Sequence, residues 1–129
     1  MPWQQIYWYA RHVKADCLIK LNEFEAASIE LTLFSKRRFT PDNKNYPWRK
    51  KVFSKLGKCL IETGQYKEAV LAFTAAIEIK EGKGNVSEAD LLVQRGIAKK
   101  KGNMKGFRID WKAATELGSK TAAKLLSGK

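Results

Sequence analysis

The chain has 129 residues, a length that suits one domain with its own buried core. Its residues are 44% hydrophobic and 29% charged, a composition typical of globular proteins and not of disordered chains. Lysine and arginine outnumber the acids by 25 to 13, so the net charge is +12 and anionic partners are favoured over cationic ones.

The first residues lack the basic start and apolar run of a secretory signal, and no apolar stretch is long enough to span a membrane. Two cysteines, Cys17 and Cys59, are too few for a disulfide framework and have no ligand cluster for zinc. We therefore expect a soluble, cytoplasmic protein in which both cysteines pack as small hydrophobic residues.

Apolar residues recur at helical spacing along the whole chain, which we read as a single all-α domain over residues 1–129. The spacing predicts three helix pairs, within 3–38, 47–80 and 87–116, and a short final helix at 119–126 that covers the last pair. The individual helices are expected at 3–21, 23–38, 47–63, 66–80, 87–101 and 104–116.

The first helix is rich in aromatic residues. One stripe at helical spacing is expected to face the core, namely Trp3, Tyr7, Ala10, Val13, Cys17 and Leu21. Trp8 and Tyr9 lie off this stripe, so we expect Trp8 to pack on the second helix and Tyr9 to be partly exposed. A surface that stacks on a ligand or forms a dimer is the alternative for these two residues. Asn22 followed by Glu25 predicts a capping box at the start of the second helix.

The middle pair has the clearest pattern. Pro47 suits the first turn of its first helix, and Gly64 suits a left-handed turn between the two helices. Gly57 and Ala69 are small enough to let the helices approach closely, and Phe73 is expected to fill the gap that remains.

The same pattern recurs on both sides of the middle pair, at a period of about 40 residues that is typical of stacked helical hairpins. The later copy contains Gly96, Gly102, Phe107, Trp111 and Ala114, and the earlier, weaker copy contains Ala15, Ala27, Leu31 and Phe34. Ser87 followed by Asp90 predicts a capping box at the start of the fifth helix.

Residues 50–83 resemble a tetratricopeptide repeat in seven positions: Leu56, Gly57, Gly64, Tyr66, Ala69, Phe73 and Ala76. The end of the chain, WKAATELGSKTAAKLL, is similar to the end of a Sel1-like repeat. The resemblance implies a right-handed superhelix of three stacked helical hairpins plus a C-terminal capping helix. It also implies a concave groove, lined by the first helix of each pair, that binds a partner protein.

Three lysines in the third helix, Lys51, Lys55 and Lys58, have the spacing i, i+4, i+7 and no acid between them. They are either an ordinary solvated face or, if the resemblance holds, the lining of the groove. We expect these lysines to bind an acidic segment of a partner, with Arg95 or Lys101 nearby. Three further groove residues, Tyr9, Val13 and Ile97, are expected to add specificity.

The resemblance also permits a test of one function of the family, which is to clamp the C-terminal carboxylates of chaperones. The corresponding positions here hold His12, Asp16, Lys55, Asp90 and Gln94, none of which is the residue that this clamp uses. Clamping of chaperone tails is therefore not expected.

No phosphate-binding loop, nucleophile motif or metal-ligand spacing occurs in the sequence, so we expect no catalytic residue, cofactor or metal, and no enzyme. A protein-interaction module or scaffold is the favoured function. The alternative is RNA binding, in which the basic surface contacts phosphates and aromatic rings stack on bases.

Overall fold

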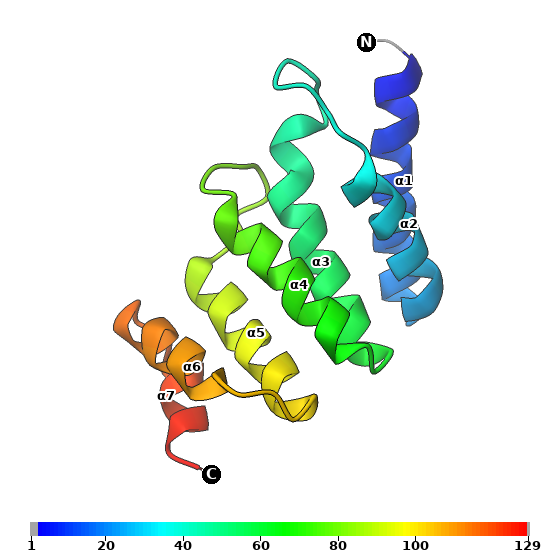
Figure 1. The fold of residues 1–129 in the computed structure, drawn as a ribbon. Coiled ribbons are helices and arrows are strands. Elements are labelled where there is room, and N and C mark those ends of the chain that lie inside the picture. The colour runs from blue at the N-terminus through cyan, green and yellow to red at the C-terminus, as the bar shows by residue number, and fades with distance from the viewer. Residues whose placement is uncertain (1–2, 129) are drawn as a thin grey trace.

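The computed structural model describes residues 3–128. Within this range the chain forms seven α-helices, one 3-10 turn and no strand (Figure 1). In chain order these elements are α1 (Trp3–Lys20), α2 (Phe24–Lys36), η1 (Tyr46–Trp48), α3 (Arg49–Glu62), α4 (Tyr66–Glu78), α5 (Glu88–Lys101), α6 (Phe107–Glu116) and α7 (Lys120–Leu126).

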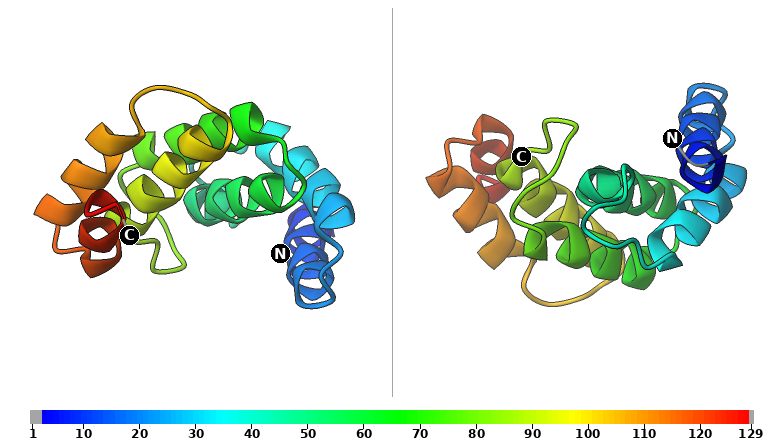
Figure 2. Two further views of the ribbon diagram at one scale, coloured as in Figure 1. Left: turned by 90° about the horizontal axis from the view of Figure 1, so that it is seen from below. Right: turned by 90° about the horizontal axis from the view of Figure 1, so that it is seen from above.

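The helices are stacked in pairs. α1 packs on α2, α3 on α4 and α5 on α6, while α2 contacts α3 and α4 contacts α5. Seen along the helices, the stack follows an arc, with α1 and α3 towards its inside and α2 and α4 towards its outside (Figure 2). The predicted all-α stack of three hairpins with a capping helix is therefore confirmed.

Glycines allow the close contact within the second and third hairpins. A Cβ atom on Gly57 would lie 2.6 Å from Cζ of the buried Phe73 ring, so only glycine fits beneath this ring. Gly96 lies against the Trp111 indole in the same way. Ala69 is completely buried in the second hairpin, as the repeat pattern predicted. The small residues thus make room for one aromatic ring in each hairpin.

The α7 helix covers the end of the last hairpin. Ala122 is fully buried in a small cluster with Val93, Trp111 and Ala114, and Leu125 and Leu126 pack against this cluster. The Ser119 hydroxyl caps the helix by accepting a hydrogen bond from the backbone N–H of Ala122 at 3.1 Å.

The core face of α1 differs from the prediction. The residues that it packs into the core are Trp8, His12, Ala15, Leu18 and Ile19, whereas Trp3, Tyr7, Ala10, Val13, Cys17 and Leu21 are exposed. This face of α1 is turned to the core because Trp8 packs edge-on against Phe34 and Phe39. The centroid of its ring lies 6.4 Å from that of Phe34 and 6.1 Å from that of Phe39. Within residues 3–128, α1 packs on α2 and contacts Trp48 and Lys55 of the next hairpin, and its other side is exposed.

The expected burial of the cysteines is therefore half right. Cys59 is buried, and this burial raises the pKa of its thiol to about 11. Cys17 lies on the open side of α1 and is exposed, so the prediction of a buried Cys17 was wrong.

Two capping predictions have different outcomes. Asn22 has a φ of 60°, in the left-handed region that asparagine tolerates, and the N-cap residue of α2 is Glu23, without a side-chain hydrogen bond. The predicted capping box at Asn22 was therefore wrong. Ser87 does cap α5, since its hydroxyl accepts from the Asp90 N–H at 3.2 Å, but the Asp90 carboxylate pairs with Lys58.

Two helix starts are also shifted. α6 begins at Phe107 and not at residue 104, because Gly106 has a φ of 94° and interrupts the helical backbone before it. Pro47 lies in the 3-10 turn η1, two residues before α3 begins at Arg49. Gly64 has a φ of 79° between α3 and α4, as predicted.

None of the helices formed by residues 3–128 has the length and apolar character needed to cross a bilayer.

Candidate partner-binding groove

A pocket of about 460 Å³ is lined by residues of α1, α3 and α5 and by Phe24 at the start of α2. Its apolar lining comes from Ile19, Phe24, Cys59 and Ile61, and its polar lining from Asp16, Lys20, Lys55, Lys58, Glu62 and Gln94. A second pocket of about 550 Å³ continues between α5 and α7, with Gln94 lining both pockets and Ile97 lining the second. We call the first pocket the groove, because Lys120 of α7 already lines the second.

Two of the three predicted groove lysines line the first pocket, and both are paired with acids of neighbouring helices. Lys55 donates to Asp16 on α1 at 2.5 Å, and Lys58 lies 3.3 Å from Asp90 on α5. The lysine stripe has no acid between its members, although Glu62 ends the same helix, and the flanking helices supply two more acids. The groove is therefore a mixed-charge surface in which the lysines are held in place.

Lys51 lies at one end of this stripe and is described in no ion pair. Its stem packs against Gly84 in the loop between α4 and α5, where a Cβ would come within 2.9 Å of it. The same loop is tied to the start of α3 by a hydrogen bond from the Lys83 N–H to the Pro47 carbonyl, 2.8 Å long. Burial, and then the charges of Lys55 and Lys58, lower the pKa of Lys51, so an anion placed here would relieve repulsion among the three.

The preceding lysine, Lys50, has a different and structural role. Its ammonium group is buried, donates to the carbonyls of Ala76 at the end of α4 and of Ile79, and pairs with Glu88 at 2.9 Å. The sequence does not distinguish Lys50 from its neighbours. Its position, one residue before the groove stripe, turns it towards α4 and α5.

His12 supports the Lys55–Asp16 pair from below. It is buried against Phe34 and Trp48, and its Nε2 lies 2.8 Å from the Lys55 ammonium, which donates to it. Burial, and then the charge of Lys55, lower the pKa of His12 to about 4, although Asp16 opposes this shift. His12 is therefore neutral at pH 7 and accepts from Lys55, which fixes the lysine at the floor of the groove.

This buried histidine should make the protein sensitive to acid. The pKa of His12 is about 4 in the folded chain against an ordinary value of 6.5. Between pH 6.5 and 4, His12 is therefore protonated in the unfolded chain but still neutral in the folded chain, which favours unfolding. The stability from neutral His12 should be fully present above pH 6.5 and be lost towards pH 4, by at most about 1.4 kcal/mol per pH unit.

Urea unfolding of the wild type and of His12→Gln between pH 7 and 4 measures this effect. Glutamine does not titrate but still offers an oxygen to Lys55. We expect the variant to lose stability less steeply with falling pH. Parallel curves for the two proteins would show that His12 is not the titrating group.

The other predicted groove residues are distributed differently. Tyr9 is half exposed beside His12 and Trp48, and Val13 is exposed on α1. Lys101 is exposed at the end of α5, at helical spacing from Gln94 and Ile97.

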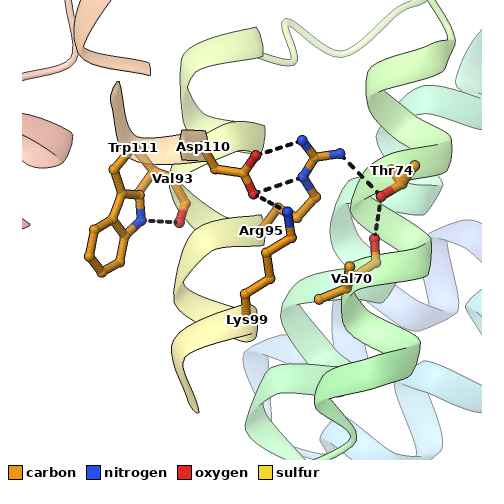
Figure 3. A network of polar contacts seen from close by, with 7 residues as sticks. All are labelled: Val70, Thr74, Val93, Arg95, Lys99, Asp110 and Trp111. Carbon is orange, nitrogen blue, oxygen red and sulfur yellow. Dashed lines mark hydrogen bonds and ion pairs between the residues drawn. The ribbon is translucent and has the colours of Figure 1, made fainter. Parts of the chain in front are cut away.

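Arg95 is engaged outside the groove. Its guanidinium donates two hydrogen bonds to the buried Asp110 carboxylate, at 2.9 and 2.6 Å, and a third to the Thr74 hydroxyl at 3.2 Å (Figure 3). Lys99 pairs with the same carboxylate at 2.9 Å. Arg95 thus links α5 to α4 and α6, and we leave it out of the groove.

Within residues 3–128 no cluster of three or more histidine, cysteine or acidic side chains has the arrangement of a metal site. Both cysteines are free thiols.

Comparison with known proteins identifies the middle of the chain. Residues 51–83, which contain most of α3, all of α4 and the start of the loop after it, match the family model of the tetratricopeptide repeat. No curated protein and no solved structure matches the chain. The α3–α4 hairpin is therefore a repeat of the tetratricopeptide type, the kind of unit found in protein-interaction modules. The similarity of the C-terminal end to a Sel1-like repeat stays a prediction.

Proposed function

We propose that the chain is a non-enzymatic interaction module of the cytoplasm that holds a segment of a partner protein in its groove. The observation that carries the proposal is the pocket between α1, α3 and α5, which combines an apolar lining with lysines held in fixed positions. A matched tetratricopeptide repeat supplies α3, the central helix of this pocket.

The chemistry of the groove favours an acidic segment with one apolar side chain. Ile19, Phe24 and Ile61 can receive the apolar side chain, and burial of such an anchor supplies most of the binding energy in interfaces of this kind. Lys20 and Lys51 have no described acid partner, whereas Lys55 is neutralised by Asp16. Because exposed charge pairs contribute only about 0–1 kcal/mol each, the acids of the partner would set its orientation more than its affinity.

A peptide array tests the proposal. Peptides with one large apolar residue flanked by Asp or Glu should bind, and the same peptides with Asn or Gln in place of the acids should bind about tenfold less well, because two or more charge pairs are then missing. The variant Lys20→Glu/Lys58→Glu should lose this preference for acids. Lys55 is left unchanged, since its side chain is mostly buried and a glutamate there would face Asp16 and disturb the fold. Lys58 and Asp90 are both exposed to solvent, so a glutamate at Lys58 costs little.

The matched control is Lys36→Glu/Lys67→Glu, which changes the net charge equally at exposed positions on α2 and α4. It should bind acidic peptides nearly as the wild type does. Equal loss in both variants, or binding that does not depend on the acids of the peptide, would rule out the groove as the binding site.

A further inference from the structure

The C-terminal end of the stack has cations without matching acids. Residues 102–128 include five basic and two acidic residues. Of the two acids, Asp110 is buried between Arg95 and Lys99, which leaves Glu116 as the exposed acid of this segment. The five basic residues are all exposed, and we call them the C-terminal basic face: Lys105, Arg108, Lys112, Lys120 and Lys124.

The cations of this face have no described acid partner. Elsewhere some cations are held by acids, as Arg11 and Lys14 are by Glu30, while others, such as Lys20 and Lys51, are described in no ion pair. No ion pair within residues 3–128 involves a member of the C-terminal basic face. Four of these five cations belong to α6 and α7, the two helices that end the stack (Figures 1 and 2).

Helices α6 and α7 fix the spacing of four of these cations. Arg108 and Lys112 are one turn apart on α6, and Lys120 and Lys124 are one turn apart on α7, which packs on α6. Between the helices lies a small pocket of about 80 Å³, with Lys100 and Arg108 beside its aromatic wall.

One ring of this aromatic wall, that of Phe107, is partly exposed and can contact a ligand. Phe107 is half-buried and packs edge-on against Trp111, with the Lys100 ammonium 5.9 Å and the Arg108 guanidinium 5.7 Å from its centroid. A partly open ring flanked by cations is the combination with which proteins bind single strands, because the ring stacks on bases and the cations follow the phosphates.

We infer that the C-terminal basic face binds single-stranded nucleic acid through its phosphates. A group of exposed cations gains most from a polyanion, since each phosphate that it neutralises releases condensed counterions. An acidic peptide offers only separate exposed pairs of small value. The apolar residues of α7, Ala122, Leu125 and Leu126, are packed against α5 and α6, but Ile109 and Leu117 of the same segment are exposed, so anionic vesicles are included in the test below.

Fluorescence anisotropy with labelled oligouridine and oligodeoxythymidine tests this inference. We expect the wild type to bind both strands, with a steep dependence on salt. Arg108→Glu/Lys112→Glu and Lys120→Glu/Lys124→Glu should each weaken binding about tenfold or more at about 0.1 M salt. The slope of log K against log salt should fall by about 0.7 for each phosphate that the variant no longer neutralises.

Two controls separate this face from general charge and from the groove. Lys36→Glu/Lys67→Glu has the same change of net charge and should weaken binding much less, and the groove variant Lys20→Glu/Lys58→Glu should keep oligonucleotide binding. Circular dichroism of each variant establishes that it is folded.

Three results would overturn the inference: no oligonucleotide binding by the wild type at about 0.05 M salt, equal losses in the control and in the C-terminal variants, or equally tight binding of poly-glutamate or of phosphatidylserine vesicles at the same salt. None of these results bears on peptide binding in the groove.

Discussion

Replacement of Asp110 by alanine should lower the free energy of unfolding by about 3–5 kcal/mol, the usual cost of removing one partner from a buried ion pair. The Asp110 carboxylate is almost completely buried and is contacted by both Arg95 and Lys99 (Figure 3). Without it, two cations would remain together in a half-buried site, and the link through Arg95 to Thr74 on α4 would lose its anchor.

Urea unfolding followed by circular dichroism measures this loss, with Glu116→Ala on the exposed side of α6 as the control, expected within about 0.5 kcal/mol of the wild type. A second variant, Arg95→Met/Lys99→Met/Asp110→Leu, removes all the charges together. It should recover most of the stability, because a buried ionic group can be replaced by packed apolar side chains at little cost. A loss below about 1 kcal/mol in Asp110→Ala would mean that the network contributes little.

The hairpins could be predicted from the sequence because their local signals are strong. Gly57 with Phe73 and Gly96 with Trp111 recur at similar spacing. A glycine that is required beneath an aromatic ring can be recognised from this spacing in one sequence alone. Ser87 begins a helix by accepting a hydrogen bond from Asp90, three residues later, and Gly64 ends one by a left-handed backbone conformation. Both signals are local, so the sequence around them is enough to predict them.

The orientation of α1 could not be predicted in this way. Apolar residues occur around most of this helix, so their spacing permits more than one core face. Phe34 and Phe39 decide between the faces by receiving Trp8, and this contact joins residues that are far apart in the chain. The predicted stripe of Trp3, Tyr7 and Val13 is exposed for that reason.

The groove illustrates the same limit for a functional site. The spacing of Lys51, Lys55 and Lys58 places them on one side of α3, but the acids that pair with Lys55 and Lys58 lie on α1 and α5. Arg95 likewise meets Asp110 across the α5–α6 hairpin. A charge pattern within one helix indicates which residues share a face, and only the packed neighbours determine which charges remain for a partner.

The contact between Gly57 and Phe73 in the middle hairpin can be tested by enlarging the first residue and shortening the second. Phe73→Ala would remove a completely buried ring and should cost about 3–5 kcal/mol, the range found for aromatic residues in cores. Gly57→Leu should also be strongly destabilising on its own, because a side chain at this position would clash with the Phe73 ring. In the double variant the leucine can occupy the space that the ring has left.

We therefore expect Gly57→Leu/Phe73→Ala to be more stable than the sum of the single effects predicts, by about 1–3 kcal/mol, as measured by a double-mutant cycle in urea. The pair Gly57→Leu and Leu71→Ala is the control, since Leu71 is exposed on the same helix as Phe73 and should give no coupling. If the two cycles give the same coupling energy, the space at Gly57 is not set by the Phe73 ring, and the glycine must be required for another reason.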